Sequence, residues 1–111
     1  MSNDVIAEFR NSGEQFIKIA KSISGEKMHQ GPANDEWSPA NIIHHMADAE
    51  AHFYIRYLRV LTENTPTTEF FDENVYPELL QYEKRDVNAS IALIESIRAS
   101  SISLFNNFNN S

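Results

Sequence analysis

The sequence predicts an all-α protein, built as an up-and-down bundle of three long helices. Three long segments repeat apolar residues at the spacing of a helix face, and no segment alternates apolar and polar residues as a half-buried strand does. The three glycines and four prolines fall almost entirely between these segments, where they would separate helices. A chain of 111 residues can bury one modest core, so we expect a single helical-bundle domain over residues 1–111.

The first helix is expected over about residues 4–23. Gly13 interrupts this segment at a cost of about 1 kcal/mol relative to alanine, which predicts a bend. Residues 24–36 hold two further glycines and a proline, and we expect a connector with room for one short helical turn. The apolar residues of the first helix lie near one face: Ile6, Phe9, Phe16, Ala20 and Ile23.

The second helix has the clearest start in the sequence. Ser38 is a suitable cap, and Pro39 suits the first helical position because its missing N–H would be unpaired there anyway. Trp37 is expected to pack beside this start, and the helix should run to about Leu61. Its predicted apolar face consists of Ile42, Met46, Ala49, Phe53, Tyr57 and Val60.

The remaining residues are expected to form a loop, a short helix and a third long helix. The loop covers residues 65–76, and the short helix covers residues 77–82. The long helix should run over about residues 86–105 with Asp86 as its cap. Its apolar side is expected to hold Ile91, Ile94, Ile97, Leu104 and Phe105.

Composition excludes several classes of function. Sixteen acidic against nine basic residues give a net charge of −7, which argues against a protein that binds nucleic acid through its phosphates. The absence of cysteine excludes disulfides, thiolate metal sites and a cysteine nucleophile. No apolar stretch has the length of a membrane span, and the N-terminal residues lack the basic and apolar regions of a signal peptide. We therefore expect a cytoplasmic protein that binds neither nucleic acid nor membrane.

A polar stripe follows the second helix beside its apolar face. It contains His45, Asp48, His52 and Arg56, all within a narrow arc. Histidine is the commonest metal ligand, and a nearby carboxylate can orient its ring, so this stripe is a candidate metal site. The alternative is that the stripe is the partly solvent-exposed edge of an amphipathic helix. Its i,i+4 side-chain pairs would then stabilise the helix by a few tenths of a kcal/mol each. By its angular position His45 should face the interior or an edge cleft, while His44 should face solvent.

Three separated stretches resemble the DinB/YfiT-like family of candidate metalloenzymes. Residues 37–50 read Trp-Ser-Pro-Ala-Asn-Ile-Ile-His-His-Met-Ala-Asp-Ala-Glu, which is similar to the family's Trp-Ser helix start followed by His-Leu-Ala-Asp-x-Glu. His45 occupies the position of the family's histidine, eight residues after Trp37, and Met46 replaces the usual leucine. Residues 71–76 and 82–90 resemble the family's loop and the start of its next helix.

The resemblance implies a four-helix bundle, often dimeric, that holds a divalent metal such as zinc or nickel through three histidines. It carries over only His45 as a ligand, because the family's His-x-x-x-His pair on the fourth helix has no counterpart after Ser90. We therefore expect a bundle whose fourth helix is missing or truncated. Among the other residues of the stripe, His52 is a further candidate ligand, and Asp48 and Arg56 are candidates to support the ligands.

Two functions follow from these expectations. The first is a metal-dependent enzyme of hydrolase or thiol-transferase type, acting on a small molecule or thiol, or an inactive truncated form of one. The alternative is a non-enzymatic helical module for dimerisation or binding. This chain alone should bind divalent metal weakly or not at all, because two of the three implied histidines are absent. We also expect a homodimer, since a bundle without its fourth helix leaves apolar faces uncovered.

Overall fold

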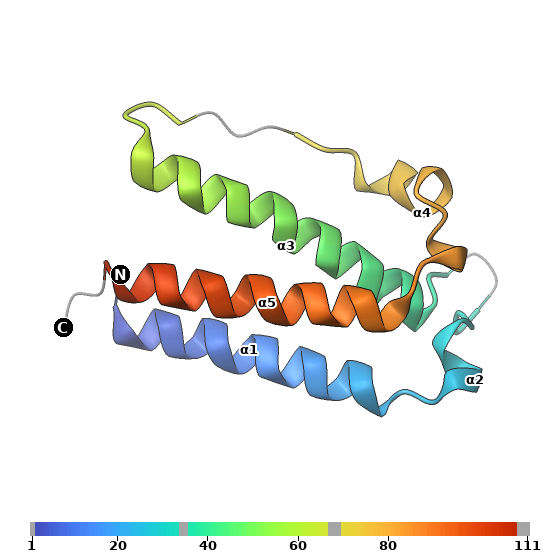
Figure 1. Cartoon of the computed structure of the whole chain (residues 1–111). Helices are drawn as coiled ribbons and strands as arrows, with labels where there is room; N and C mark the ends of the chain where they lie inside the picture. The colour runs from blue at the N-terminus through green and yellow to red at the C-terminus, as the bar shows by residue number, and fades with distance from the viewer. Residues whose placement is uncertain (1, 34–35, 67–69, 109–111) are drawn as a thin grey trace.

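The computed structural model is helical throughout its ordered elements (Figure 1), as the sequence predicts. It describes residues 2–33, 36–66 and 70–108, and within these ranges it contains no strand. None of the helices in these ranges is long and apolar enough to cross a membrane. The long helices are α1 (Asn3–Ser22), α3 (Pro39–Thr62) and α5 (Val87–Asn106). The short elements are α2 (Gly25–Met28), η1 (Glu73–Val75), α4 (Tyr76–Leu79) and η2 (Tyr82–Lys84), of which η1 and η2 are 3₁₀ turns.

Helix α5 packs against both α1 and α3, and in the view of Figure 1 it lies between them. It runs parallel to α3, and residues 70–84, which come before it, run back along α3 in the opposite direction. The contacts between the two helices keep a nearly constant offset in sequence, from His44–Ser90 at their first turns to Tyr57–Phe105 near their ends. Residues 70–84 therefore lie against the outer side of α3, where α4 and η2 contact it, and do not form a tight hairpin between the two helices.

The predicted helix ends are largely confirmed. Ser38 Oγ accepts a hydrogen bond from the Asn41 backbone N–H at 3.2 Å, and Pro39 occupies the first turn of α3. Asp86 caps α5 by accepting from the Asn88 N–H at 2.9 Å. These caps satisfy N–H groups that have no partner within the helix. The predicted connector also contains its short turn, α2.

Gly13 has a role other than the predicted bend. Helix α1 is continuous through Gly13, which is buried against α5. A Cβ atom at this position would lie 2.9 Å from Cδ of Arg98, closer than real Cβ contacts allow. The glycine thus makes room for the Arg98 side chain to cross α1.

The core lies where the first half of α3 meets α5 and the end of α1. It contains mostly small and β-branched side chains, so the helices approach closely: Ala20, Met28, Ala40, Ile43, Ala47, Ile91 and Ile94. From α5, Ile91, Ile94 and Phe105 are buried as predicted, while Ile97 and Leu104 are only partly buried.

Helix α3 is rotated relative to the sequence prediction. The prediction that His44 faces solvent is wrong, because His44 is fully buried against α5, together with the acidic Glu50. Within the predicted apolar face, Ile42, Phe53 and Val60 are exposed. The interior positions are taken by His44 and Glu50, and each has a partner on α5 that compensates in part for its desolvation. Nε2 of His44 and Oε2 of Glu50 have no hydrogen-bond partner among the described residues.

Candidate functional site

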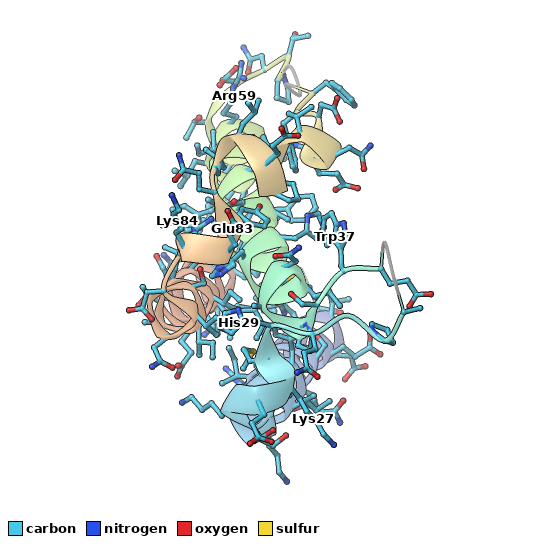
Figure 2. The ribbon with its side chains drawn as sticks, turned by 90° about the vertical axis from the view of Figure 1, so that its right-hand side faces the viewer. Lys27, His29, Trp37, Arg59, Glu83 and Lys84 are labelled. Atoms are coloured by element: carbon cyan, nitrogen blue, oxygen red, sulfur yellow. The ribbon has the colours of Figure 1, made fainter. Side chains whose placement is uncertain are left out.

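The candidate site lies on the outer side of α3, where the segment of residues 70–76 returns across the helix. Trp37, just before α3, flanks the helix on the side away from α5 (Figure 2). The predicted polar stripe of α3 faces this returning segment rather than the bundle core. Three of its four residues contact groups that come from outside α3, and these contacts build the site.

His45 is held between Trp37 and Glu73. Its ring meets the Trp37 ring edge-on, with centroids 5.3 Å apart and planes inclined by 72°. Its Nε2 lies 3.5 Å from Oε2 of Glu73, the first residue of η1. The His45 side chain is 27% exposed, so the imidazole is partly buried and partly accessible to solvent. This agrees with the predicted position of His45 at an edge of the bundle.

His52 holds the returning segment in place from two turns further along α3. Its Nε2 is hydrogen bonded to the Tyr76 hydroxyl at 2.8 Å. Its ring also stacks on Phe71, with centroids 3.8 Å apart and planes within 4° of parallel. One histidine thus contacts the chain on both sides of η1, so the position of that turn relative to α3 is well determined.

Asp48 anchors the η2 turn to α3. Its Oδ2 accepts hydrogen bonds from the Tyr82 hydroxyl at 2.7 Å and from Nη1 of Arg85 at 2.8 Å. Burial of the phenol, together with its bond to the Asp48 carboxylate, raises the pKa of Tyr82. The same carboxylate raises the pKa of Arg85 through its hydrogen bond. Both donors therefore keep their protons, and Asp48 is the fixed acceptor between them.

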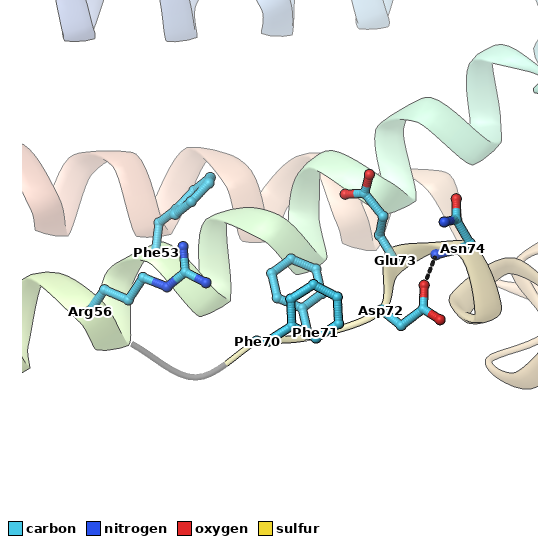
Figure 3. Close-up of a pocket in the computed structure, with 7 residues that line it drawn as sticks. All are labelled: Phe53, Arg56, Phe70, Phe71, Asp72, Glu73 and Asn74. Carbon is cyan, nitrogen blue, oxygen red and sulfur yellow. Dashed lines mark hydrogen bonds between the residues drawn. The ribbon is translucent and has the colours of Figure 1, made fainter. Parts of the chain in front are cut away.

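An open cleft of about 360 Å³ adjoins this arrangement (Figure 3). Its volume is at the lower end of the range typical of small-molecule sites. Arg56 lies over the Phe53 ring, with its guanidinium carbon 5.3 Å from the centroid. Within the cleft, Glu73 points toward α3, whereas Asp72 points to the other side and accepts from the Asn74 N–H (Figure 3). The residues that line the cleft are Phe53, Arg56, Phe70, Phe71, Asp72, Glu73 and Asn74.

The structure separates the four predicted site residues rather than gathering them. His45 and His52 contact different parts of the returning segment, Asp48 faces η2, and Arg56 lines the cleft. In the portion of the chain that the structure describes, no three histidine, aspartate or glutamate side chains converge as a metal site would require. His45 with Glu73 offers two of the three or four protein donors that a divalent metal uses. The described residues therefore fit part of a metal shell.

Sequence reasoning missed Glu73. It lies 28 residues after His45, in a segment expected to be a loop, and no periodicity links it to the helix. The only available signal was the resemblance of residues 71–76 to the family's loop, which assigned Glu73 no role.

Sequence comparison decides the family. A sequence profile described as the DinB superfamily matches residues 8–110, which is nearly the whole chain. The chain belongs to the DinB superfamily.

Several proteins that are similar in sequence to this chain have names that refer to metal. A protein of Oceanobacillus iheyensis named "Putative metal-dependent hydrolase OB0782" is 28% identical over 101 residues, which cover 87% of this chain and 58% of that protein. "Putative metal-dependent hydrolase YfiT" of Bacillus subtilis is 30% identical over 82 residues, which cover 73% of this chain and 46% of YfiT. The chain thus spans about half the length of these relatives.

The fold is also similar to that of a solved structure. The solved structure of YfiT from Bacillus subtilis, described as having an unusual four-helix bundle topology, superposes with a TM-score of 0.80 at 23% identity. The match covers 96% of this chain and 63% of the YfiT chain. The parallel arrangement of α3 and α5 is therefore part of a known bundle fold.

Proposed function

We propose that this chain forms part of a metal-dependent hydrolase, in which His45 is a ligand of a divalent metal such as zinc or nickel. One observation carries the proposal: His45 is half-buried, and its Nε2 is aimed at a carboxylate beside a cleft of small-molecule size. The position of His45 in the helix that resembles the family's motif supports the same assignment. The names of the DinB superfamily relatives agree with a metal-dependent activity.

The residues around His45 would prepare it for this role. Edge-on packing against Trp37 limits rotation of the imidazole, so little freedom remains to be lost when Nε2 binds a cation. A metal bound there would supply a Lewis acid that polarises a carbonyl and lowers the pKa of water. The aromatic side chains of the cleft would bind an apolar part of the substrate. Arg56, which stacks on Phe53, would favour a substrate with a negative group.

The remaining donors would come from outside the described residues or from a second copy of the chain. A homodimer is part of this proposal, and an apolar groove of about 200 Å³ between α1 and α3 supports it. The described residues that line this groove are all apolar: Phe16, Ile19, Ala20, Ile23, Pro39, Ile42 and Ile43. Since none of these seven side chains is charged, the same surface of another copy could cover them without burying a charge of theirs. We place this activity in the cytoplasm, in keeping with the absence of cysteine.

Calorimetric titration with zinc and nickel tests the proposal. We expect weak binding that is abolished in His45→Ala and retained in His29→Ala, which removes an exposed histidine of the connector. Hydrolysis of an activated aromatic ester, measured with and without the metal, should depend on His45 in the same way. Equal metal binding by the wild type and His45→Ala would overturn the assignment of His45.

A further inference from the structure

We infer that Glu73 is the second metal ligand that this chain supplies, paired with His45. This inference rests on the proposed function, because it concerns the same site. It assigns a ligand from the returning segment, where the sequence offers neither a histidine nor a helical spacing. Four observations carry it: the separation of the two donor atoms, the support of η1, the open surroundings and the donor chemistry.

The separation of the two donor atoms suits a shared metal better than a direct bond. His45 Nε2 and Glu73 Oε2 are 3.5 Å apart, whereas charge-assisted N–H···O bonds are typically about 2.7–2.9 Å long. Two ligands bound tetrahedrally to zinc at about 2.1 Å would be roughly 3.4 Å apart. The pair thus already has the spacing of two neighbouring ligands, and a cation could bind with little movement of either side chain.

Glu73 is supported from both sides, as a ligand needs to be. Asp72 accepts a hydrogen bond from the Asn74 N–H at 3.1 Å and fixes the first turn of η1. Phe71 and Tyr76 both contact His52, which binds the two flanks of η1 to α3. Because these contacts involve neither Nε2 of His45 nor the Glu73 carboxylate, the support leaves both donors available. That His52 is itself a ligand stays a prediction, and its contacts with Tyr76 and Phe71 favour a role in holding η1.

The surroundings leave room for the rest of a metal shell. The Glu73 side chain is 51% exposed and that of His45 is 27% exposed, so the pair lies at the surface. Glu73 also lines the cleft, so a ligand in the cleft would lie next to the pair. A catalytic zinc keeps one coordination position for water or substrate, and mixed histidine and glutamate ligand sets occur in zinc hydrolases. A carboxylate here would also add the negative charge that a divalent cation prefers.

Trp37 provides a direct readout of this site. It is the only tryptophan in the chain, and its ring lies 5.3 Å from the His45 ring. A Ni²⁺ ion bound to His45 should quench the fluorescence of Trp37. A titration of the 111-residue chain with NiCl₂ therefore measures the affinity for the metal without any substrate. The variants are Glu73→Gln, its matched control Glu78→Gln on the exposed surface of α4, and His45→Ala. Circular dichroism of each variant checks that it is folded.

The expected result is His45-dependent quenching whose affinity falls about tenfold or more in Glu73→Gln, while Glu78→Gln matches the wild type. If Glu73→Gln binds Ni²⁺ as tightly as the wild type, and His45→Ala does not bind it, then the inference fails and the proposed function stands. If the titration curves of His45→Ala and the wild type are the same, the proposed function fails, and the inference fails with it. A loss of affinity in Glu78→Gln equal to that in Glu73→Gln would show a general charge effect, and would also overturn the inference.

Discussion

Glu50 and Arg98 form a buried ion pair between α3 and α5, with Nη2 of Arg98 2.7 Å from Oε1 of Glu50 and side chains only 3% and 20% exposed. Arg98 also donates from Nη1 to the Phe9 carbonyl oxygen at 2.8 Å, and its guanidinium lies over the Phe9 ring at 4.1 Å. One side chain therefore connects all three long helices. Gly13 belongs to this arrangement, since it provides the space through which Arg98 passes.

Gly13→Ala should destabilise the protein, although alanine is the better helix former by about 1 kcal/mol. The new Cβ would lie 2.9 Å from Cδ of Arg98, and the contacts of Arg98 with Glu50 and Phe9 prevent it from moving aside freely. Gly25→Ala is the matched control, because no atom of the described residues lies within 4 Å of a Cβ added there. In urea unfolding, Gly13→Ala should have the lower midpoint and Gly25→Ala should not. A urea midpoint for Gly13→Ala above that of the wild type would contradict this, and would show that the Arg98 side chain can move aside.

Arg98→Met should cost about 3–5 kcal/mol of unfolding free energy, because it leaves the Glu50 carboxylate buried without its partner. Replacing both residues, as in Glu50→Leu with Arg98→Met, should recover much of that loss, since no buried charge then remains. Urea unfolding of the two single variants and the double variant measures the coupling between these residues. Additive losses would contradict a specific pair.

The sequence predicted the helices well because their signals are local. Ser38 and Asp86 lie within three residues of the N–H groups they cap, so the helix starts could be identified from neighbouring residues alone. The rotation of α3 could not be found in this way. His44 and Glu50 are buried against partners that lie 46 and 48 residues away in the sequence. Hydrophobic periodicity instead placed the apolar stripe in the interior, which rotates α3 about its axis by roughly 100° from its actual orientation.

The candidate site was predicted only in part for the same reason. His45 and its helix could be selected from the stripe and the family resemblance. Glu73, Phe71 and Tyr76 come from an irregular segment, whose path depends on its contacts with His52 rather than on a repeating pattern. The cleft forms where this segment returns across α3, so the spacing of apolar residues along the helix could not predict it.

His44 should make the stability of the protein depend on pH between about 5.5 and 7.5. Its burial lowers its pKa below 6.5, Arg85 adds to this effect, and Asp48 opposes it more weakly. Its Nδ1 is hydrogen bonded to the Ser90 hydroxyl at 2.7 Å. As pH falls below 6.5, the unfolded chain gains a proton at this residue before the folded chain does. The free energy of unfolding should therefore decrease, by at most about 1.4 kcal/mol per pH unit for this one group.

Urea unfolding at pH 7.5, 6.5 and 5.5 measures this dependence. The slope should be smaller in His44→Gln than in the wild type. His29→Gln is the control: it removes an exposed histidine whose charge makes the smallest contribution to the lowered pKa of His44, so it should change the slope less than His44→Gln does. An identical slope in His44→Gln and the wild type would show that other groups cause the pH dependence.

Asp48→Ala should destabilise the η2 turn and the start of α5, because Tyr82 and Arg85 would lose their shared acceptor. Hydrogen bonds to a charged group contribute about 1.5–3 kcal/mol each, so the loss should exceed 2 kcal/mol. Tyr82→Phe removes one of the two bonds and should cost about half as much. Thermal unfolding of both variants tests this order, and a smaller loss for Asp48→Ala than for Tyr82→Phe would contradict it.

Self-association through the groove between α1 and α3 is the last prediction. Ile19 lines this groove and is 63% exposed, so Ile19→Glu should leave the monomer folded while placing a charge in the interface. Each apolar side chain that becomes fully buried on dimerisation contributes about 1.5–3 kcal/mol, and an unpaired buried carboxylate would offset several of them. Leu79→Glu is the matched control, because Leu79 is 71% exposed on α4, outside the groove. Sedimentation equilibrium at micromolar concentration should show a dimer for the wild type and Leu79→Glu, and a monomer for Ile19→Glu. A wild-type mass of 12.7 kDa, with a melting temperature independent of concentration, would mean that the three helices are stable without a partner in the groove.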